Sequence, residues 1–237
     1  MKLFLDEYCL FCNGILNPVV SWNSVFLEVD EQLICQDCQG RLRPLDGERC
    51  RMCSRILESD YRENDLCYDC VRWEKDSDWA GILARNTSLY EYNDFIKEVI
   101  AKFKYRGDYT LARAFKYAFQ VHLKSQVFDY LTPIPLSQER LYERGFNQAE
   151  ALILEAGFKP TILLTRIHTE KQSKKSRSDR IHLPQVFQLD SKGLIAIEGK
   201  NILIVDDIYT TGSTLRHAAK ILHEYGAKKV ESLTLAR

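Results

Sequence analysis

Small hydroxyl residues around a glycine follow two adjacent carboxylates in the last third of the sequence. The apolar residues 202–205 predict a buried strand, and the two acids come at its carboxyl end. The hydroxyl-rich residues then open an amphipathic helix predicted for residues 213–225, and they are Thr210, Thr211, Gly212, Ser213 and Thr214. The first N–H groups of a helix attract anions, and a glycine lets a phosphate approach the backbone closely. We therefore expect these five residues to hold a phosphate monoester.

The acid pair beside this loop consists of Asp206 and Asp207. Two carboxylates repel a phosphate, so they must recognise another part of the ligand. They suit two hydroxyl groups of a sugar, or a Mg²⁺ ion held together with the sugar and a pyrophosphate. A phosphate loop next to such a pair predicts a pocket for ribose 5-phosphate. The alternative is an ordinary turn followed by a Ser/Thr helix cap.

The eight cysteines form four Cys-x-x-Cys pairs, all in the N-terminal part of the sequence. The pairs are Cys9/Cys12, Cys35/Cys38, Cys50/Cys53 and Cys67/Cys70. One such turn aims two sulfurs into the same space, and two turns complete the tetrahedral set of four cysteines that suits Zn²⁺. The spacing predicts two closed, structural zinc sites without catalytic chemistry. A redox relay and an iron–sulfur cluster are the alternatives.

Two pairings of the cysteine turns are open. Sequential pairing joins the first pair with the second and the third with the fourth, as in tandem zinc ribbons. Cross-braced pairing joins the first with the third and the second with the fourth. Sequential pairing closes shorter loops and therefore costs less entropy, but loop length discriminates only weakly between the two.

A pyrophosphate needs cations, and two segments of the sequence are candidates to supply them. Residues 133–148 follow a predicted strand and carry Arg140 and Arg144, which can bind a phosphate in bidentate fashion. Residues 103–108 carry Lys104 and Arg106. The alternative for the two arginines is a solvated position beside the neighbouring glutamates.

A third basic segment, residues 166–180, contains six Lys or Arg residues and two acids. It has no apolar face, so we expect it to be mobile. Two interpretations of this composition stay open, namely a contact for single-stranded nucleic acid and a solvated surface loop.

The hydrophobic pattern of residues 80–237 predicts alternating strands and helices. Helices are expected from residue 93 or 94, through the apolar positions 111–119, at 147–155 after a polar loop, and at 213–225. Strands are expected at 130–135, 162–164, 186–189, 201–205 and 230–235. This order predicts an α/β fold with a mostly parallel sheet covered on both faces.

Charge is divided unevenly along the 237 residues, although the formal net charge is zero. Residues 1–79 hold 9 Lys/Arg and 16 Asp/Glu, whereas residues 80–237 hold 24 and 17. This asymmetry and the cysteine distribution predict two domains, a zinc module at 1–78 and an α/β domain at 79–237. No window has the roughly 20 apolar residues that cross a bilayer, and the first residues do not resemble a signal peptide. We therefore expect a cytoplasmic protein without a transmembrane segment.

Residues 202–214 resemble the signature of type I phosphoribosyltransferases, enzymes that use phosphoribosyl pyrophosphate (PRPP). In that family the acid pair contacts the ribose hydroxyls and the five-residue loop holds the 5-phosphate. The resemblance implies these roles for Asp206 and Asp207 and for the loop from Thr210 to Thr214. It also implies Mg²⁺ as the ion that accompanies PRPP, and a flexible loop in the place of residues 166–180.

The whole arrangement resembles the ComF (ComFC) late-competence proteins of bacteria. The segments that carry this resemblance are the cysteine pairs and residues 104–108, 133–135, 144–148 and 202–214, which together cover nearly the whole chain. It implies a type I phosphoribosyltransferase fold behind a double zinc ribbon, and a role in natural transformation beside a DNA-translocating ATPase at the membrane. The strongly basic residues 166–180 depart from the family pattern, so no role is transferred to them.

Two functions are therefore expected of this chain. The favoured one is a PRPP-binding protein of DNA uptake, with a competence ATPase or helicase as partner at the inner face of the membrane. Single-stranded DNA is a second expected partner, contacted through the basic domain, residues 166–180, Tyr105 and Tyr109. The acidic zinc module suits a basic protein better than DNA. The alternative is an active phosphoribosyltransferase with an unidentified acceptor, because no cluster of residues that would read a nucleobase is visible in the sequence.

Overall fold

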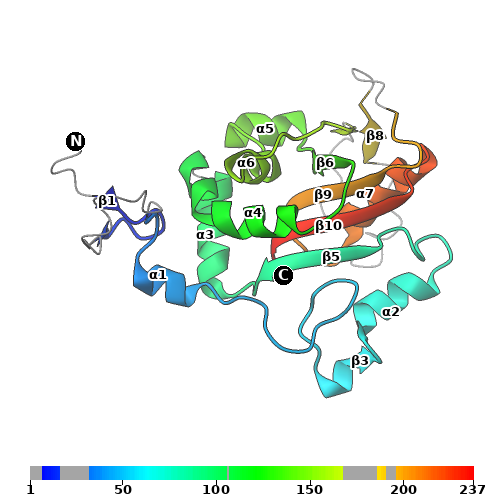
Figure 1. Cartoon of the computed structure of the whole chain (residues 1–237), viewed down its shortest axis with the longest axis horizontal. Helices are drawn as coiled ribbons and strands as arrows, with labels where there is room; N and C mark the ends of the chain where they lie inside the picture. The colour runs from blue at the N-terminus through cyan, green and yellow to red at the C-terminus, as the bar shows by residue number, and fades with distance from the viewer. Residues whose placement is uncertain (1–6, 17–31, 106, 168–185, 191–195) are drawn as a thin grey trace.

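A parallel four-stranded sheet forms the centre of the molecule in this computed structural model, which describes residues 7–16, 32–105, 107–167, 186–190 and 196–237. The strand order is β5-β10-β9-β6, and every neighbouring pair is parallel. The strands are β5 (Arg85–Tyr90), β6 (Tyr130–Pro133), β9 (Asn201–Ile208) and β10 (Lys229–Ala236), drawn side by side in Figure 1. The predicted parallel α/β sheet is confirmed.

Both faces of this sheet are buried, as the continuous apolar run of β9 requires. Successive residues of a strand point to opposite faces. Leu203 and Val205 accordingly belong to one hydrophobic core, whereas Ile202 and Ile204 belong to another. The sheet therefore separates two cores, and each core needs its own cover.

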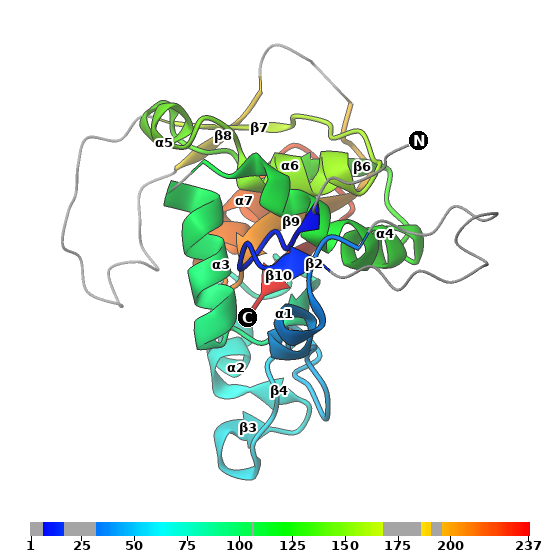
Figure 2. The same cartoon turned by 90° about the vertical axis from the view of Figure 1, so that its left-hand side faces the viewer.

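Helices that precede and follow β6 in the sequence cover the first core (Figures 1 and 2). They are α3 (Asp94–Tyr105), η3 (Tyr109–Phe115), α4 (Lys116–Lys124) and α6 (Gln148–Glu155). The helix predicted through positions 111–119 begins with the 3₁₀ turn η3 and continues as α4. Helix α7 (Ser213–Glu224) packs into the second core, on the other side of the sheet.

One helix lies where the sequence pattern predicts a polar loop. This helix is α5 (Gln138–Arg144), and the Ser137 hydroxyl caps it by accepting a hydrogen bond from Arg140 N. It ends at Gly145, which has a φ of 78° in the left-handed region. A Ser N-cap and a glycine just after the last turn are ordinary helix boundaries, and they outweigh the missing apolar face, since no residue of α5 is buried. The loop prediction is wrong at this segment.

Two predicted strands do not join the main sheet. β7 (Leu164–Arg166) and β8 (Phe187–Leu189) pair with each other in antiparallel register, Leu164 opposite Leu189. They lie outside the mostly parallel sheet that the sequence predicts, and β7 shares only Leu164 with the strand predicted at 162–164. An antiparallel partner needs no helical crossover, so the two strands form a separate ribbon.

The N-terminal region forms two small units, each built around four cysteines. The first contains the hairpin of β1 (Glu7–Tyr8) and β2 (Ile15–Leu16) and the helix α1 (Gln36–Arg41). The second contains β3 (Arg62–Glu63), β4 (Leu66–Cys67), the 3₁₀ turn η2 (Ser59–Tyr61) and α2 (Tyr68–Lys75). Figures 1 and 2 show the two units at different sides of the sheet domain.

Each cysteine unit packs into a different core of the α/β domain. Phe11 of the first unit contacts Phe95 and Phe115, with ring centroids 5.7 and 5.5 Å apart. Cys50 and Cys53 of the second unit belong to the core of α7 instead. The predicted boundary between residues 78 and 79 stays a prediction, and both cores extend across it.

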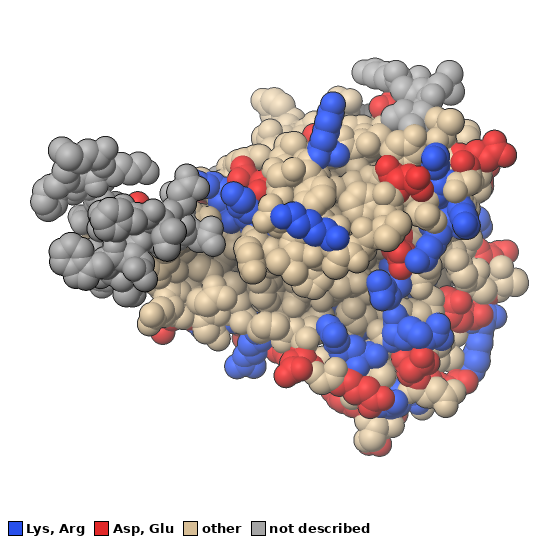
Figure 3. Space-filling view, viewed as in Figure 1, with Lys and Arg blue, Asp and Glu red and all other residues tan. Residues whose placement is uncertain are grey.

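Charged side chains on the face shown in Figure 3 are mixed rather than segregated. Around α2 and β3, acids alternate with basic residues. Arg62 pairs with Glu48 at 2.5 Å, and Lys75 pairs with Glu63 at 3.1 Å. The acidity of residues 1–79 is therefore partly compensated by local ion pairs, each of which contributes little to stability. Among the described residues, no helix has both the length and the apolar character needed to cross a membrane.

Candidate phosphate and metal sites

The phosphate loop connects the carboxyl end of β9 to the first turn of α7. Asp206 lies opposite Thr234 of β10, so the acids and the loop occupy the carboxyl edge of the parallel sheet. Ligands bind at this edge in open α/β sheets. Gly212 is the N-cap of α7 and has no side chain to cap the helix, while Thr211 Oγ1 accepts a hydrogen bond from Ser213 N at 3.4 Å. Binding of a phosphate at this helix start stays a prediction.

Gly212 has a structural reason besides access to a ligand. Its φ is 78°, in the left-handed region that favours glycine. A Cβ added at this position would overlap the hydroxyl of Tyr209 and the guanidinium of Arg216. Arg216 is fully buried, and its Nη1 donates a hydrogen bond to the Tyr209 hydroxyl at 2.8 Å. The loop therefore rests on a packed Tyr–Arg pair that leaves no room for a side chain.

The two acids at the end of β9 have different surroundings. Asp207 is buried at 7% exposure, and its Oδ2 lies 2.5 Å from Nζ of Lys104. Asp206 is half-buried, and its Oδ1 accepts a hydrogen bond from Asp207 N at 2.8 Å. Burial first, and next the charge of Asp207, raise the pKa of Asp206 to about 8, although Lys104 lowers it in part. One proton is therefore held at the acid pair near neutral pH.

Cations from separate elements gather around this pair. Burial, and next the charge of Arg140, lower the pKa of Arg166, whereas the charge of Asp206 raises it. Arg166 of β7 therefore lies within electrostatic reach of both Asp206 and Arg140 of α5. Lys104 of α3 and Arg166 approach the acid pair, and Arg140 lies near Arg166.

The four residues that the sequence predicts to bind pyrophosphate have different surroundings. Lys104 contacts Asp207, whereas Arg140 is exposed and lies near Arg166. Their role in binding pyrophosphate stays a prediction. Arg144 instead donates a hydrogen bond to Gln148 Oε1 at 2.8 Å, and its guanidinium lies 5.9 Å from the centre of the Tyr105 ring. Arg106 lies outside the described residues. Sequence reasoning did not single out Arg166, although its place at the end of a predicted strand was a usable signal. Of the basic segment 166–180, the structure describes only residues 166 and 167.

The cysteines form two clusters, each with all four sulfurs within 4.8 Å of one another. The first cluster is Cys9, Cys12, Cys35 and Cys38, and the second is Cys50, Cys53, Cys67 and Cys70. The grouping is the sequential one, so the first pair joins the second and the third joins the fourth. The cross-braced alternative does not describe this chain.

The donor set and its hydrogen bonds fit zinc in both clusters. Four thiolate sulfurs at this spacing can surround one Zn²⁺ at about 2.3 Å each. Backbone N–H groups point at the sulfurs, from Cys35 N to Cys9 Sγ at 3.3 Å and from Cys67 N to Cys50 Sγ at 3.4 Å. Such donors stabilise thiolates. With no open coordination position, the metal would supply folding energy only.

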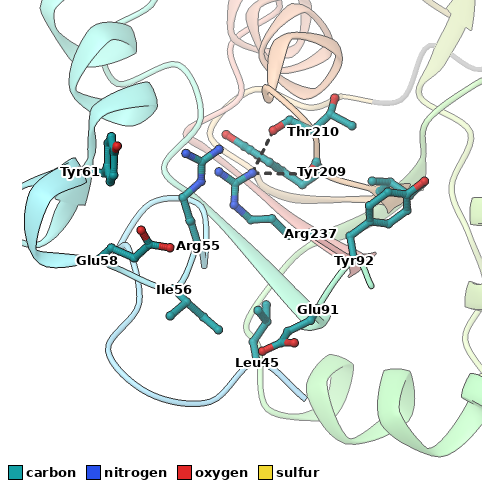
Figure 4. Close-up of a pocket in the computed structure, with 11 residues that line it drawn as sticks. Leu45, Arg55, Ile56, Glu58, Tyr61, Glu91, Tyr92, Tyr209, Thr210 and Arg237 are labelled. Atoms are coloured by element: carbon teal, nitrogen blue, oxygen red, sulfur yellow. Dashed lines mark hydrogen bonds between the residues drawn. The ribbon is translucent and has the colours of Figure 1, made fainter. Parts of the chain in front are cut away.

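A cleft of about 540 Å³ lies between the second cysteine unit and the phosphate loop. Arg55 and Tyr61 line it from the cysteine unit, and Tyr92, Thr210 and Arg237 line it from the α/β domain (Figure 4). Its position shows that the cysteine unit reaches the carboxyl edge of the sheet. The sequence contained no signal for this meeting of two distant segments.

Known proteins resemble this chain over nearly its whole length. A model of the phosphoribosyl transferase domain family matches residues 143–237. Competence protein ComFC of Bacillus subtilis (strain 168) is 39% identical over 234 residues, which cover 97% of this chain and 94% of that protein. Competence protein ComFC of Streptococcus pneumoniae is 33% identical over 230 residues, which cover 97% and 99%. The chain belongs to the ComFC competence protein family. The predicted family and the predicted phosphoribosyltransferase fold are thereby confirmed.

Solved structures with this fold are more distant. The glutamine PRPP amidotransferase of B. subtilis, in complex with ADP and GMP, has a TM-score of 0.37 and 18% identity, covering 56% of this chain and 30% of that one. A likeness at this level says nothing about ligands. Membership of the ComFC family connects the chain with competence by name, and the phosphoribosyl transferase domain match includes the acid pair and the phosphate loop.

Proposed function

We propose that this chain binds PRPP together with Mg²⁺ at the carboxyl end of β9 and acts in DNA uptake. The observation that carries the proposal is the grouping of the acid pair, the start of α7 and the cations Lys104 and Arg166 at one edge of a parallel sheet. PRPP needs these three kinds of group, since it combines a 5-phosphate, a ribose with free hydroxyls and a pyrophosphate.

Each part of the ligand has a candidate partner in this arrangement. The amides and hydroxyls of the loop from Thr210 to Thr214 would hold the 5-phosphate. Asp206 and Asp207 would accept hydrogen bonds from the ribose hydroxyls. Arg140 and Arg166 would face the pyrophosphate, where guanidinium groups bind phosphate oxygens in bidentate fashion.

Mg²⁺ fits this site because the acid pair offers the oxygen ligands that the ion prefers. When bound, it would neutralise charge on the pyrophosphate. Lys104 already contacts Asp207 Oδ2, so a ligand that reaches this oxygen must share it with the lysine or displace the ammonium group. Asp206 must release its proton to act as a full acceptor, which links binding to pH.

The role in DNA uptake rests on the family and on the charge of the α/β domain. Two relatives that cover nearly the whole chain are competence proteins by name. We propose a competence ATPase or helicase as partner, with contact at the inner face of the membrane from the cytoplasm. Single-stranded DNA is a further proposed ligand, because Tyr105 is 78% exposed, Tyr109 is 38% exposed and basic residues flank them.

Phosphoribosyl transfer to an acceptor is the second candidate function. The cleft beside Thr210 favours it, since a volume of about 540 Å³ can accommodate a small acceptor next to the loop. In such a reaction pyrophosphate leaves the sugar, and Arg140 and Arg166 would stabilise its negative charge. Release of pyrophosphate from PRPP in the presence of an acceptor would support this candidate.

Calorimetric titration of PRPP with Mg²⁺ into the full chain tests the proposed site. The Asp206→Ala/Asp207→Ala variant should bind at least about 100-fold more weakly, because hydrogen bonds to charged groups contribute roughly 1.5–3 kcal/mol each. Asp46→Ala is the matched control, since Asp46 is exposed and accepts a hydrogen bond from the adjacent Gly47 N. An absence of binding to the unmodified chain, or equal binding by the double variant, would contradict the proposed PRPP site.

A further inference from the structure

Side chains from other segments hold three consecutive carbonyls at the start of the phosphate loop, those of Tyr209, Thr210 and Thr211. Arg237 Nη1 donates to Thr210 O at 3.0 Å and to Tyr209 O at 3.5 Å, as Figure 4 shows. The indole Nε1 of Trp73 donates to Thr211 O at 2.9 Å. Arg237 follows β10, but Trp73 lies 138 residues before its partner in the sequence. The long-range bond ties the loop to the N-terminal region.

The second cysteine cluster places Trp73. This residue belongs to α2, which begins one residue after Cys67 and contains Cys70. Two of the four metal-ligating sulfurs therefore anchor the helix that carries the indole, and Trp73 lies one turn after Cys70. Trp73 is buried at 7% exposure, so its ring has little freedom to move away from the loop.

The same indole also touches the packed pair beneath the loop. The Arg216 guanidinium lies 4.6 Å from the centre of the Trp73 ring, and Arg216 in turn binds the hydroxyl of Tyr209. Trp79 packs edge-on against Trp73, with ring centroids 5.5 Å apart. Trp73 therefore contacts the loop twice, through a hydrogen bond to its backbone and through the arginine that supports it.

The first cysteine cluster lies elsewhere. Its residues pack in the core of α3 and η3, and Lys102 of α3 donates to Phe11 O at 2.7 Å. The two clusters are a natural comparison because they share ligand type and number, but among the described residues only the second contacts the phosphate loop through its own helix.

We propose that the second cysteine cluster positions the phosphate loop through Trp73, so that metal in this cluster sets the affinity of the loop for phosphate. The peptide group is planar and trans, so a carbonyl and the following N–H point in opposite directions. A hydrogen bond that draws Thr211 O toward Trp73 therefore turns Gly212 N–H toward the opposite side, where an anion at the start of α7 would bind. Trp73 is a positioning residue, and loss of its N–H should loosen the loop without removing any loop residue.

Hydrogen exchange of the ligand-free, zinc-loaded chain is the first test. Trp73→Phe keeps an aromatic ring but loses the donor to Thr211 O. We expect faster amide exchange across residues 210–214 in this variant and an unchanged zinc content by mass spectrometry. Trp79→Phe is the matched control, because it changes the neighbouring ring and leaves the bond to the loop intact. Equal protection of the loop in Trp73→Phe and the unmodified chain would overturn the proposal.

Binding of inorganic phosphate and of PRPP with Mg²⁺ is the second test, and it rests on the proposed function. Loss of one neutral hydrogen bond should weaken binding about fivefold in Trp73→Phe and leave Trp79→Phe within about twofold of the unmodified chain. Cys70→Ser should weaken binding more than Cys12→Ser, and a larger effect of Cys12→Ser would contradict the assignment. If PRPP fails to bind the unmodified chain, the proposed function fails, whereas the exchange experiment still decides on the positioning role of Trp73.

Discussion

At the scale of single residues, two adjacent acids have different surroundings. Asp207 is paired with the ammonium group of Lys104, whereas Asp206 is half-buried, and burial and the charge of Asp207 raise its pKa. Close carboxylates in a buried place rarely ionise together. The pair therefore stores a proton, and any ligand that needs both carboxylates must expel it.

This stored proton predicts a pH dependence of ligand binding. The pKa of Asp206 is raised to about 8, so the affinity for PRPP with Mg²⁺ should rise as pH increases from 6 to about 8. The limiting slope is about tenfold per pH unit, because one proton is released on binding. Calorimetry across this range measures the slope. Asp206→Asn, which cannot titrate, should lose this contribution, and a parallel profile in the variant would contradict the assignment.

The same group affects folding stability in the opposite direction. The unfolded pKa of an aspartate is about 3.9, so between this value and about 8 the folded chain binds more protons than the unfolded chain. The contribution of Asp206 to stability is therefore full below the unfolded pKa and is lost as pH rises toward 8. A rise in pH toward 8 should therefore strengthen ligand binding and reduce folding stability, both through the carboxyl group of Asp206.

At the scale of elements, the two cysteine units differ in how far they are buried. Cys12 of the first cluster is exposed, whereas all four cysteines of the second cluster are buried. Closed metal sites exchange faster where a chelator or water can reach a ligand. The second unit also shares its core with α7 and the central strands, so opening it disturbs more of the molecule.

This difference predicts two phases of zinc release. A chelator with a colorimetric readout should remove one zinc per chain quickly and the other slowly. Cys12→Ser should abolish the fast phase, and Cys53→Ser should abolish the slow phase and leave about one zinc per chain. Cys53→Ser should also increase proteolysis between residues 45 and 75. A single phase in the unmodified chain, or unchanged zinc content in both variants, would contradict the assignment of ligands.

Sequence patterns identified most elements at this scale, and the exceptions have physical reasons. β9 and α7 were predictable because an apolar run, an acid pair and a glycine-containing cap occur in one short segment. Helix α5 was not predictable, because it has no buried apolar face and only Ser137 and Gly145 mark its ends. β8 was recognised as a strand and β7 was predicted two residues too early, but apolar character does not specify which strand is the partner.

At the scale of the whole molecule, the carboxyl edge of one sheet brings together segments from the entire chain. Lys104 and Arg166 approach the acid pair from two separate elements, and Trp73 reaches the loop from the cysteine region. Chain folding thereby links the region with an excess of acids to the region with an excess of bases.

Binding of single-stranded DNA is the prediction that belongs to this scale. A labelled oligonucleotide should bind with an affinity that falls as salt increases, because contacts to phosphates release counterions. Tyr105→Ala should weaken binding about 5- to 100-fold, since stacking contributes roughly 1–3 kcal/mol per base. Tyr117→Ala, which removes an equally exposed ring on α4, is the control. Fluorescence anisotropy measures both, and equal affinity of the two variants would contradict a DNA contact at Tyr105.

The sequence by itself determined the local chemistry of this protein, because that chemistry resides in contiguous residues. The phosphate loop, the acid pair and the four cysteine turns are each complete within a few positions, and their hydrogen-bonding and ligand properties follow from residue type. Only the tertiary structure decided which cysteine pairs meet, which cations face the acids, and that Trp73 holds the phosphate loop. These facts depend on packing between segments that are distant in the chain, and residue spacing carries no information about which distant surfaces come into contact.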